Sequence, residues 1–169
     1  ATVIIVTVAG ITGATFALWP TSWPDHQLLI TPQKVQKLKA MRSGPKFMQD
    51  DENHYPGAAN EAVRIAAETK LNALLDSLAN GLPEYQRESF VMSQFKGTLG
   101  QFGDFDSEEK DRLLLYLEEV MNTLGIRSSN ELFNVWRYGF PYGWILPKTK
   151  PLAAAGRYDK SAAVAPRNR

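Results

Sequence analysis

Few side chains in this sequence have the types and the spacing that chemistry needs. His26 and His54 are the two histidines, and neither belongs to an HxxxH or HExxH pattern that would hold a zinc ion. Carboxylates cluster at 50–52, in a polar segment, and at 108–111, where they begin a predicted helix and favour the positive end of its dipole. The chain contains no cysteine, which excludes thiolate chemistry and disulfides. We therefore expect a protein that is not an enzyme, with no catalytic residue, no metal site and no required cofactor.

The first element of the chain is an uncharged apolar segment, Thr2 to Trp19. A helix of this length is about 27 Å long, close to the ~30 Å hydrocarbon core of a bilayer. Trp19 and Trp23 are typical of a membrane–water interface, and Pro20 would stop the helix. The segment predicts a single-pass transmembrane anchor over residues 1–20, and a buried core helix or an uncleaved signal remnant are the alternatives. The chain opens on alanine rather than methionine, which suggests earlier processing or truncation.

Small residues recur along this segment at Ala9, Gly13 and Ala17, a spacing that places them on one helix face. Such a face lets another transmembrane helix, a pigment or a lipid approach the backbone closely. Small residues are also common in any membrane helix. We favour a helix-packing interface, with other transmembrane subunits and membrane lipids as partners.

Residues 21–45 read as a Pro-rich elbow followed by a basic amphipathic helix. Thr31-Pro32 is a helix start signal and Gly44-Pro45 a stop. Its polar side carries four cations, Lys34, Lys37, Lys39 and Arg42. This basic surface is either a solvated helix face or a contact with anionic head groups.

Residues 46–140 predict a helical bundle domain. Helical spacing runs from about residue 60 to 80, and Pro83 is expected to open the next helix. Asp106-Ser-Glu-Glu109 has the form of a capping box and predicts a helix that ends at Gly125. Ser128-Ser-Asn-Glu131 predicts another helix start. The fold class is therefore all-α, an N-terminal transmembrane helix followed by a small bundle and an extended C-terminal tail.

The last part, residues 141–169, combines an extended aromatic segment with a basic tail. Trp136 and Phe140, just before it, are expected to pack in the core. Tyr142 and Trp144 are the better candidates for partner contact, because rigid aromatics dominate interface anchors.

Several motifs resemble a known pattern. They are YPG at 55–57, YLEEVM at 116–121, LGIRSS at 124–129 and NVWRYGF at 134–140. Between Lys34 and Phe140 the chain resembles the mostly bacterial family called domain of unknown function 4844. The resemblance implies a small helical domain and brings no established activity or catalytic residue. The anchor and the tail lie outside it.

With a formal charge of +1, no strong field favours nucleic acid. We expect a non-catalytic accessory subunit of a large membrane complex, in an energy-converting membrane and most simply a photosynthetic thylakoid. In such a setting His26 could ligate chlorophyll at the end of the anchor. The alternatives are a membrane-anchored bacterial envelope binding protein, such as a toxin-immunity or inhibitor protein, a mitochondrial respiratory accessory subunit, and an uncharacterised enzyme.

Overall fold

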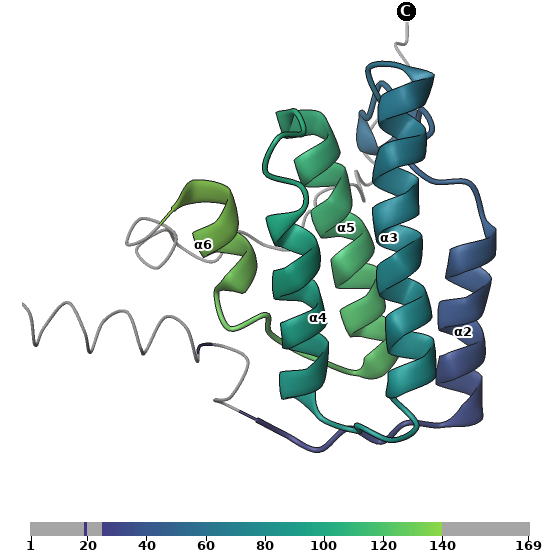
Figure 1. Ribbon diagram of the computed structural model, residues 1–169, viewed down its shortest axis with the longest axis vertical. Helices are drawn as coiled ribbons and strands as arrows, with labels where there is room; N and C mark the ends of the chain where they lie inside the picture. The colour runs from purple at the N-terminus through teal and green to yellow at the C-terminus, as the bar shows by residue number, and fades with distance from the viewer. Residues whose placement is uncertain (1–18, 20–24, 140–169) are drawn as a thin grey trace, which may run out of the picture.

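The computed structural model describes Trp19 and residues 25–139, and this part of the chain is helical (Figure 1). The helices, labelled as in Figure 1, are α2 (Pro32–Ser43), the 3-10 helix η1 (Asp51–Asn53), α3 (Glu61–Gly81), α4 (Glu88–Gly100), α5 (Ser107–Leu124) and α6 (Leu132–Tyr138). Within the described ranges, β-type pairing is restricted to isolated bridges, Gln27 with Arg87 and Asp50 with Tyr55. The prediction of an all-α domain is confirmed for these residues.

Helices α2 to α5 run up and down side by side, with their connections at alternate ends (Figure 1). α3 contacts both α2 and α4, and α2 also contacts α5, which connects the four helices of the bundle in the order α5, α2, α3 and α4. The lower end in Figure 1 holds the starts of α2 and α4, and the upper end holds the connections 44–60 and 101–106. The short helix α6 packs beside α4, where the Phe133 ring lies 5.9 Å from the Phe95 ring.

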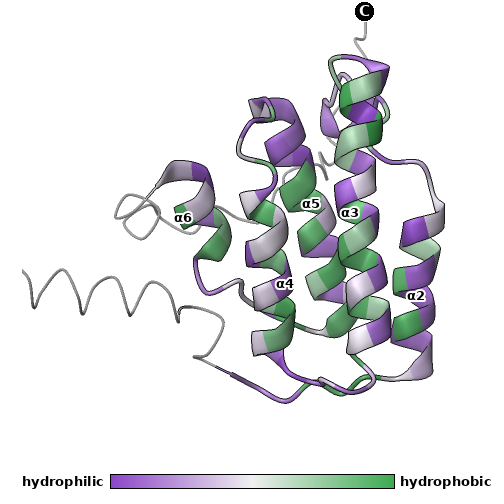
Figure 2. Cartoon of the chain, viewed as in Figure 1, coloured by the Kyte–Doolittle hydropathy of each residue, from purple (hydrophilic) through white to green (hydrophobic). Residues whose placement is uncertain are grey.

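The core lies between the four long helices. Leu71, Leu75 and Leu78 are buried along α3 at the i, i+4, i+7 spacing that a core-facing stripe requires. Phe95 from α4 and Leu117 from α5 are fully buried opposite them. Figure 2 shows the lower half of α5 in hydrophobic colour where it lies behind α3 and α4. Burying each of these side chains stabilises the fold by about 1.5–3 kcal/mol, so this core fixes the four helices relative to one another.

Three predicted helix ends, at Thr31, at about residue 60 and at Gly125, are confirmed, and the structure adds the cap bond at Asn60. Thr31 stands at the N-cap of α2 and its Oγ1 accepts from the Lys34 N–H. Asn60 stands at the N-cap of α3, where its Oδ1 accepts from the Val63 N–H at 3.0 Å. Gly125 ends α5 with φ of 85°, a left-handed conformation that glycine adopts without a Cβ penalty.

The predicted helix start at Pro83 is wrong, because α4 begins at Glu88. The carbonyl of Gly81 accepts from the backbone N–H groups of Glu84 and Tyr85, which turns the chain after α3. Pro83 therefore lies in this turn, and Tyr85, two residues later, is exposed.

The predicted capping box marks the correct start of α5, but its predicted N-cap hydrogen bond does not form. Asp106 occupies the N-cap position but makes no side-chain cap hydrogen bond. Glu109, the other member of the box, is 1% exposed, and its Oε1 accepts from the N–H of Ala59 at 3.2 Å. The side chain therefore holds the 44–60 connection onto α5 instead of closing a local cap.

The second predicted capping box does not form. α6 begins at Leu132, and Glu131 takes the N-cap position with φ of 66° and no side-chain cap bond. Ser128 Oγ accepts from the Asn130 N–H at 3.0 Å, a local turn of the kind that serine favours over helix interiors.

Among the described residues, none of the helices combines the length and the apolar character needed to cross a bilayer. Apart from Trp19, the predicted anchor over 1–20 lies outside the described residues. So do the predicted interface and contact residues Ala9, Gly13, Ala17, Trp23, Tyr142 and Trp144. Within the described range, Trp136 packs against the core as expected.

Candidate functional site

Residues 25–31, which we call the strap, run along the lower end of the bundle (Figure 1). The N–H of Leu28 donates to the carbonyl of Gln86 at 2.8 Å, and the N–H of Glu88 donates to the carbonyl of His26 at 2.9 Å. These bonds attach the strap to the connection between α3 and α4. Because the strap follows the apolar segment closely in sequence, it is the place where the bundle is joined to that segment.

Asp25 supplies the N-cap that α4 lacks. Arg87 occupies the N-cap position of α4 and makes no side-chain cap bond there. Asp25 Oδ1 accepts from the Ser89 N–H at 3.0 Å, and its Oδ2 accepts from Arg87 Nη1 at 2.6 Å. Burial raises the pKa of Asp25, but the hydrogen bonds from Ser89 and the Arg87 charge outweigh it, so the pKa lies below its ordinary value of 3.8.

His26, the predicted pigment ligand, lies at the lower end of the bundle with its side chain 68% exposed. Its Nδ1 lies 2.9 Å from Glu88 Oε2. One ring nitrogen is therefore occupied by a carboxylate, and a ligand would have to bind through Nε2.

Trp19, a predicted interface residue, is half-buried and packs against the core. Its carbonyl accepts from Lys96 Nζ of α4 at 3.0 Å. The chain is thus fixed to α4 at Trp19, and fixed again at Asp25.

Lys34 of α2 connects the strap to the C-terminal end of α5. Its Nζ donates to the carbonyl of Leu29 in the strap and to the carbonyl of Leu124 at the end of α5, both at 2.8 Å. A cation at a helix C-terminus interacts favourably with the helix dipole.

The structure places the four cations of the predicted basic surface in different environments. Lys34 is turned toward the two carbonyls, and Arg42 pairs with Asp76 of α3 at 2.9 Å. Lys37 and Lys39 are exposed. Because α2 stands along the bundle axis, these residues lie at different heights above the lower end (Figure 1).

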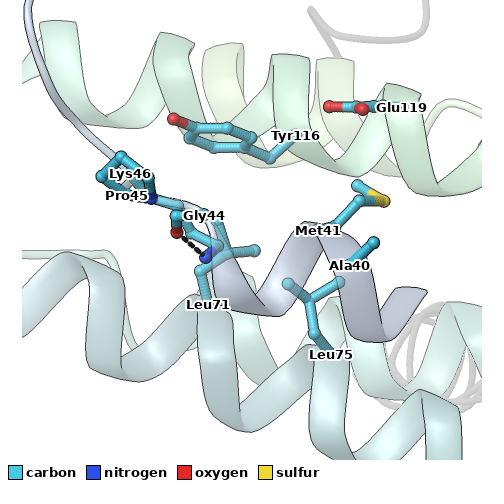
Figure 3. Close-up of a pocket in the computed structure, with 9 residues that line it drawn as sticks. All are labelled: Ala40, Met41, Gly44, Pro45, Lys46, Leu71, Leu75, Tyr116 and Glu119. Carbon is cyan, nitrogen blue, oxygen red and sulfur yellow. Dashed lines mark hydrogen bonds between the residues drawn. The ribbon is translucent and has the colours of Figure 1, made fainter. Parts of the chain in front are cut away.

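A pocket of about 190 Å³ lies between α2, α3 and α5 (Figure 3). Its apolar lining comes from Met41, Leu71 and Leu75, and the ring of Tyr116 lies on the α5 side. The polar residues at this pocket are Lys46 and Glu119.

Lys46 beside this pocket is 3% exposed, and sequence reasoning missed it because a lysine after Gly44-Pro45 reads as a surface residue. Its Nζ donates to the carbonyls of Arg42 at 2.9 Å and Gly44 at 2.7 Å, so it closes the C-terminus of α2. Burial lowers the pKa of Lys46 below its ordinary value, outweighing the attraction of Glu68.

A largely buried polar cluster around Arg112 joins the sequence motifs at 55–57 and 116–121. The guanidinium of Arg112 lies between the rings of Tyr55 and Tyr116, at 5.3 and 5.1 Å from their centroids. Arg112 Nη1 also pairs with Asp50 Oδ2 at 2.6 Å. Burial, with a further contribution from the Glu109 charge, raises the pKa of Tyr55 to about 12. The cluster stabilises the 44–60 connection on α5.

In the part of the chain that the structure describes, no three or more metal-ligating side chains come together in a way that could hold a metal ion. The family model described as Domain of unknown function (DUF4844) matches residues 29–141. The chain belongs to this family. No curated protein and no solved structure matches it.

The DUF4844 match includes every described helix and the motif residues Tyr55 and Tyr116. It begins at Leu29, inside the strap, so Trp19, Asp25 and His26 precede it. The cap on α4 is therefore made by a residue outside the DUF4844 match.

Proposed function

We propose that this chain is a membrane-tethered, non-catalytic accessory subunit of a larger membrane protein complex. In this proposal the apolar segment 2–19 spans the bilayer, and the bundle is the part that projects from it. The observation that carries the proposal is the double fixation of the chain behind this segment, at Trp19 on α4 and at Asp25 on the start of α4. A bundle fixed in this way would follow the position of the segment instead of swinging on a flexible linker.

The contacts of the buried and half-buried charged side chains support a structural role for them over a catalytic one. Lys46 closes a helix end, Glu109 holds a loop N–H, and Arg112 is enclosed by two rings and a carboxylate. Each of these charged groups has at least one partner in the backbone or in a neighbouring ring or ion pair, although Glu109 Oε2 and Arg112 Nε have no hydrogen-bond partner among the described residues.

The host complex in this proposal belongs to an energy-converting membrane, with a photosynthetic membrane preferred to a respiratory one. A pigment or lipid contact at His26 is part of the same proposal, through the ring nitrogen that Glu88 does not bind. The bacterial envelope binding protein stays the alternative prediction.

The test is native electrophoresis of membranes opened with a mild detergent. We expect the full chain to migrate with a large complex, and a chain that migrates as a free monomer would contradict the proposal. In a second arm, Gly13→Leu should release the chain from the complex while leaving it in the membrane, because it blocks close helix approach. Val3→Leu, on the same segment, is the matched control and should leave the complex intact.

A further inference from the structure

Exposed apolar side chains lie at both ends of the bundle, and two of them are at the lower end, where the strap lies against the connection 82–87. Leu29 of the strap is 77% exposed, and Tyr85 of the connection is 53% exposed. The bond between Leu28 and Gln86 joins the two segments next to these residues. We call the strap and residues 82–87 together the strap edge.

Charge is distributed unevenly between the two ends of the bundle. Exposed charged residues at the lower end include Arg87, Arg127 and Glu84, whose carboxylate belongs to the strap edge. The carboxylates of Asp25 and Glu88 at that end are engaged by Arg87 and His26. The upper end presents a different set of exposed side chains, Asp51, Glu52, Glu61, Asp104, Asp106 and Glu108.

The order of the segments along the chain indicates which partner lies near the strap edge. Trp19, which ends the uncharged apolar segment, is fixed on α4, and the strap begins six residues later at Asp25. If the segment spans a bilayer, the bilayer surface lies within reach of the strap edge. Partly exposed aromatic and aliphatic side chains suit a membrane interface, and an anionic membrane would repel the exposed carboxylates of the upper end.

We infer that the strap edge lies on the surface of an anionic lipid bilayer, with Leu29 and Tyr85 inserted among the head groups and the acidic end of the bundle directed away. This inference rests on the proposed tether and adds an orientation to it. It moves the lipid contact from the length of α2 to the end of the bundle, because Lys34 and Arg42 already have partners inside the protein.

The absence of cysteine from the sequence gives a direct test. Single variants Leu29→Cys and Tyr85→Cys of the full chain receive a fluorescent label in vesicles of phosphatidylcholine and phosphatidylglycerol. Met48→Cys and Ile65→Cys at the upper end are matched controls, since both residues are 51% exposed. Thermal unfolding of each labelled variant checks that the fold is retained.

We expect a lipid-borne quencher to reduce fluorescence at positions 29 and 85 several-fold more than at 48 and 65, and aqueous iodide to show the reverse order. Vesicle flotation separates the two proposals. If the chain floats with the vesicles while all four labels stay equally open to iodide, the orientation is overturned and the tether stands. If the chain does not float, the tether itself fails. Concentration-dependent shielding of positions 29 and 85 without vesicles would assign the strap edge to a second copy of the chain and overturn the lipid assignment.

Discussion

Asp25 caps a helix that begins more than sixty residues later in the chain, because its Oδ1 accepts from the backbone N–H of Ser89 at 3.0 Å. The bond fastens the segment that precedes the family-matched bundle onto α4. Asp25→Ala should lower the free energy of unfolding by about 1 kcal/mol, the usual loss for an N-cap. Urea unfolding measures it, and Asp25→Asn is the control, because asparagine also caps and should retain most of the stability. Equal losses in both variants would place the contribution in the Arg87 ion pair instead of the cap.

The pKa of Asp25 predicts a pH dependence. A carboxyl whose pKa is lower in the folded state adds stability that is fully present above its unfolded pKa and is lost as pH falls through the folded pKa. The stability difference between the wild-type chain and Asp25→Asn should therefore be constant above the ordinary value of 3.8 and shrink below it. Urea midpoints measured from neutral pH down to pH values below 3.8 test this, and a difference that grows with acid would contradict it.

Lys34 should stabilise the bundle more than its exposed neighbours do. Its Nζ donates to the carbonyls of Leu29 and Leu124, and hydrogen bonds from a charged group contribute about 1.5–3 kcal/mol. Lys34→Met should lose part of this, with an expected cost of about 1–2 kcal/mol. Lys37→Met is the matched control and should stay within about 0.5 kcal/mol of the wild type, as surface changes do. Thermal unfolding of both variants decides the point, and equal melting temperatures would count against the cap on α5.

Two glycines should respond in opposite directions to alanine. A Cβ on Gly81 would lie 2.4 Å from Cζ of Phe90, whose ring is stacked on Tyr85, so the ring must move. Gly81→Ala should destabilise by about 1–3 kcal/mol. Gly97, inside α4, has no heavy atom within 4 Å of such a Cβ, and Gly97→Ala should stabilise by about 0.5–1 kcal/mol. Differential scanning calorimetry of the pair would reject this packing if both changes shifted the melting temperature the same way.

The raised pKa of Tyr55 predicts that the fold loses stability at alkaline pH. Its pKa is raised to about 12, above the ordinary value of 10.0, so the folded state holds the phenol proton more tightly than the unfolded state. Its contribution is fully present below pH 10.0 and is lost as pH rises toward about 12. Ultraviolet absorbance of tyrosinate should show a late-titrating component that Tyr55→Phe removes. A Tyr55→Phe titration identical to that of the wild type would place the late-titrating group elsewhere.

The elements that sequence reasoning predicted correctly depend on neighbours in the chain. Thr31 and Gly125 act within a few residues of themselves, so their types and spacing were enough. Pro83 and Glu131 carried equally good local signals, and the turn bonds around them took precedence. A local motif predicts the end of a helix only where no competing turn forms.

The contacts that sequence reasoning missed act across the bundle. Asp25 on Ser89, Lys34 on Leu124 and Glu109 on Ala59 join groups that lie far apart in sequence. Lys46 is similar, because its burial follows from the packing of α2 against α3 and α5. Composition gives no signal for such pairs, since each residue alone reads as an ordinary surface charge.

The two-sided attachment of the strap has a mechanical consequence. A pull on the N-terminal segment would reach α4 through Trp19 and then Asp25, and the end of α5 through Lys34, because Lys34 also holds the carbonyl of Leu29. The load would be shared between two antiparallel helices and would stress several hydrogen bonds at once instead of unzipping them one by one. Such an attachment resists extraction of a single helix and passes displacement of the segment to the bundle as a rigid-body movement.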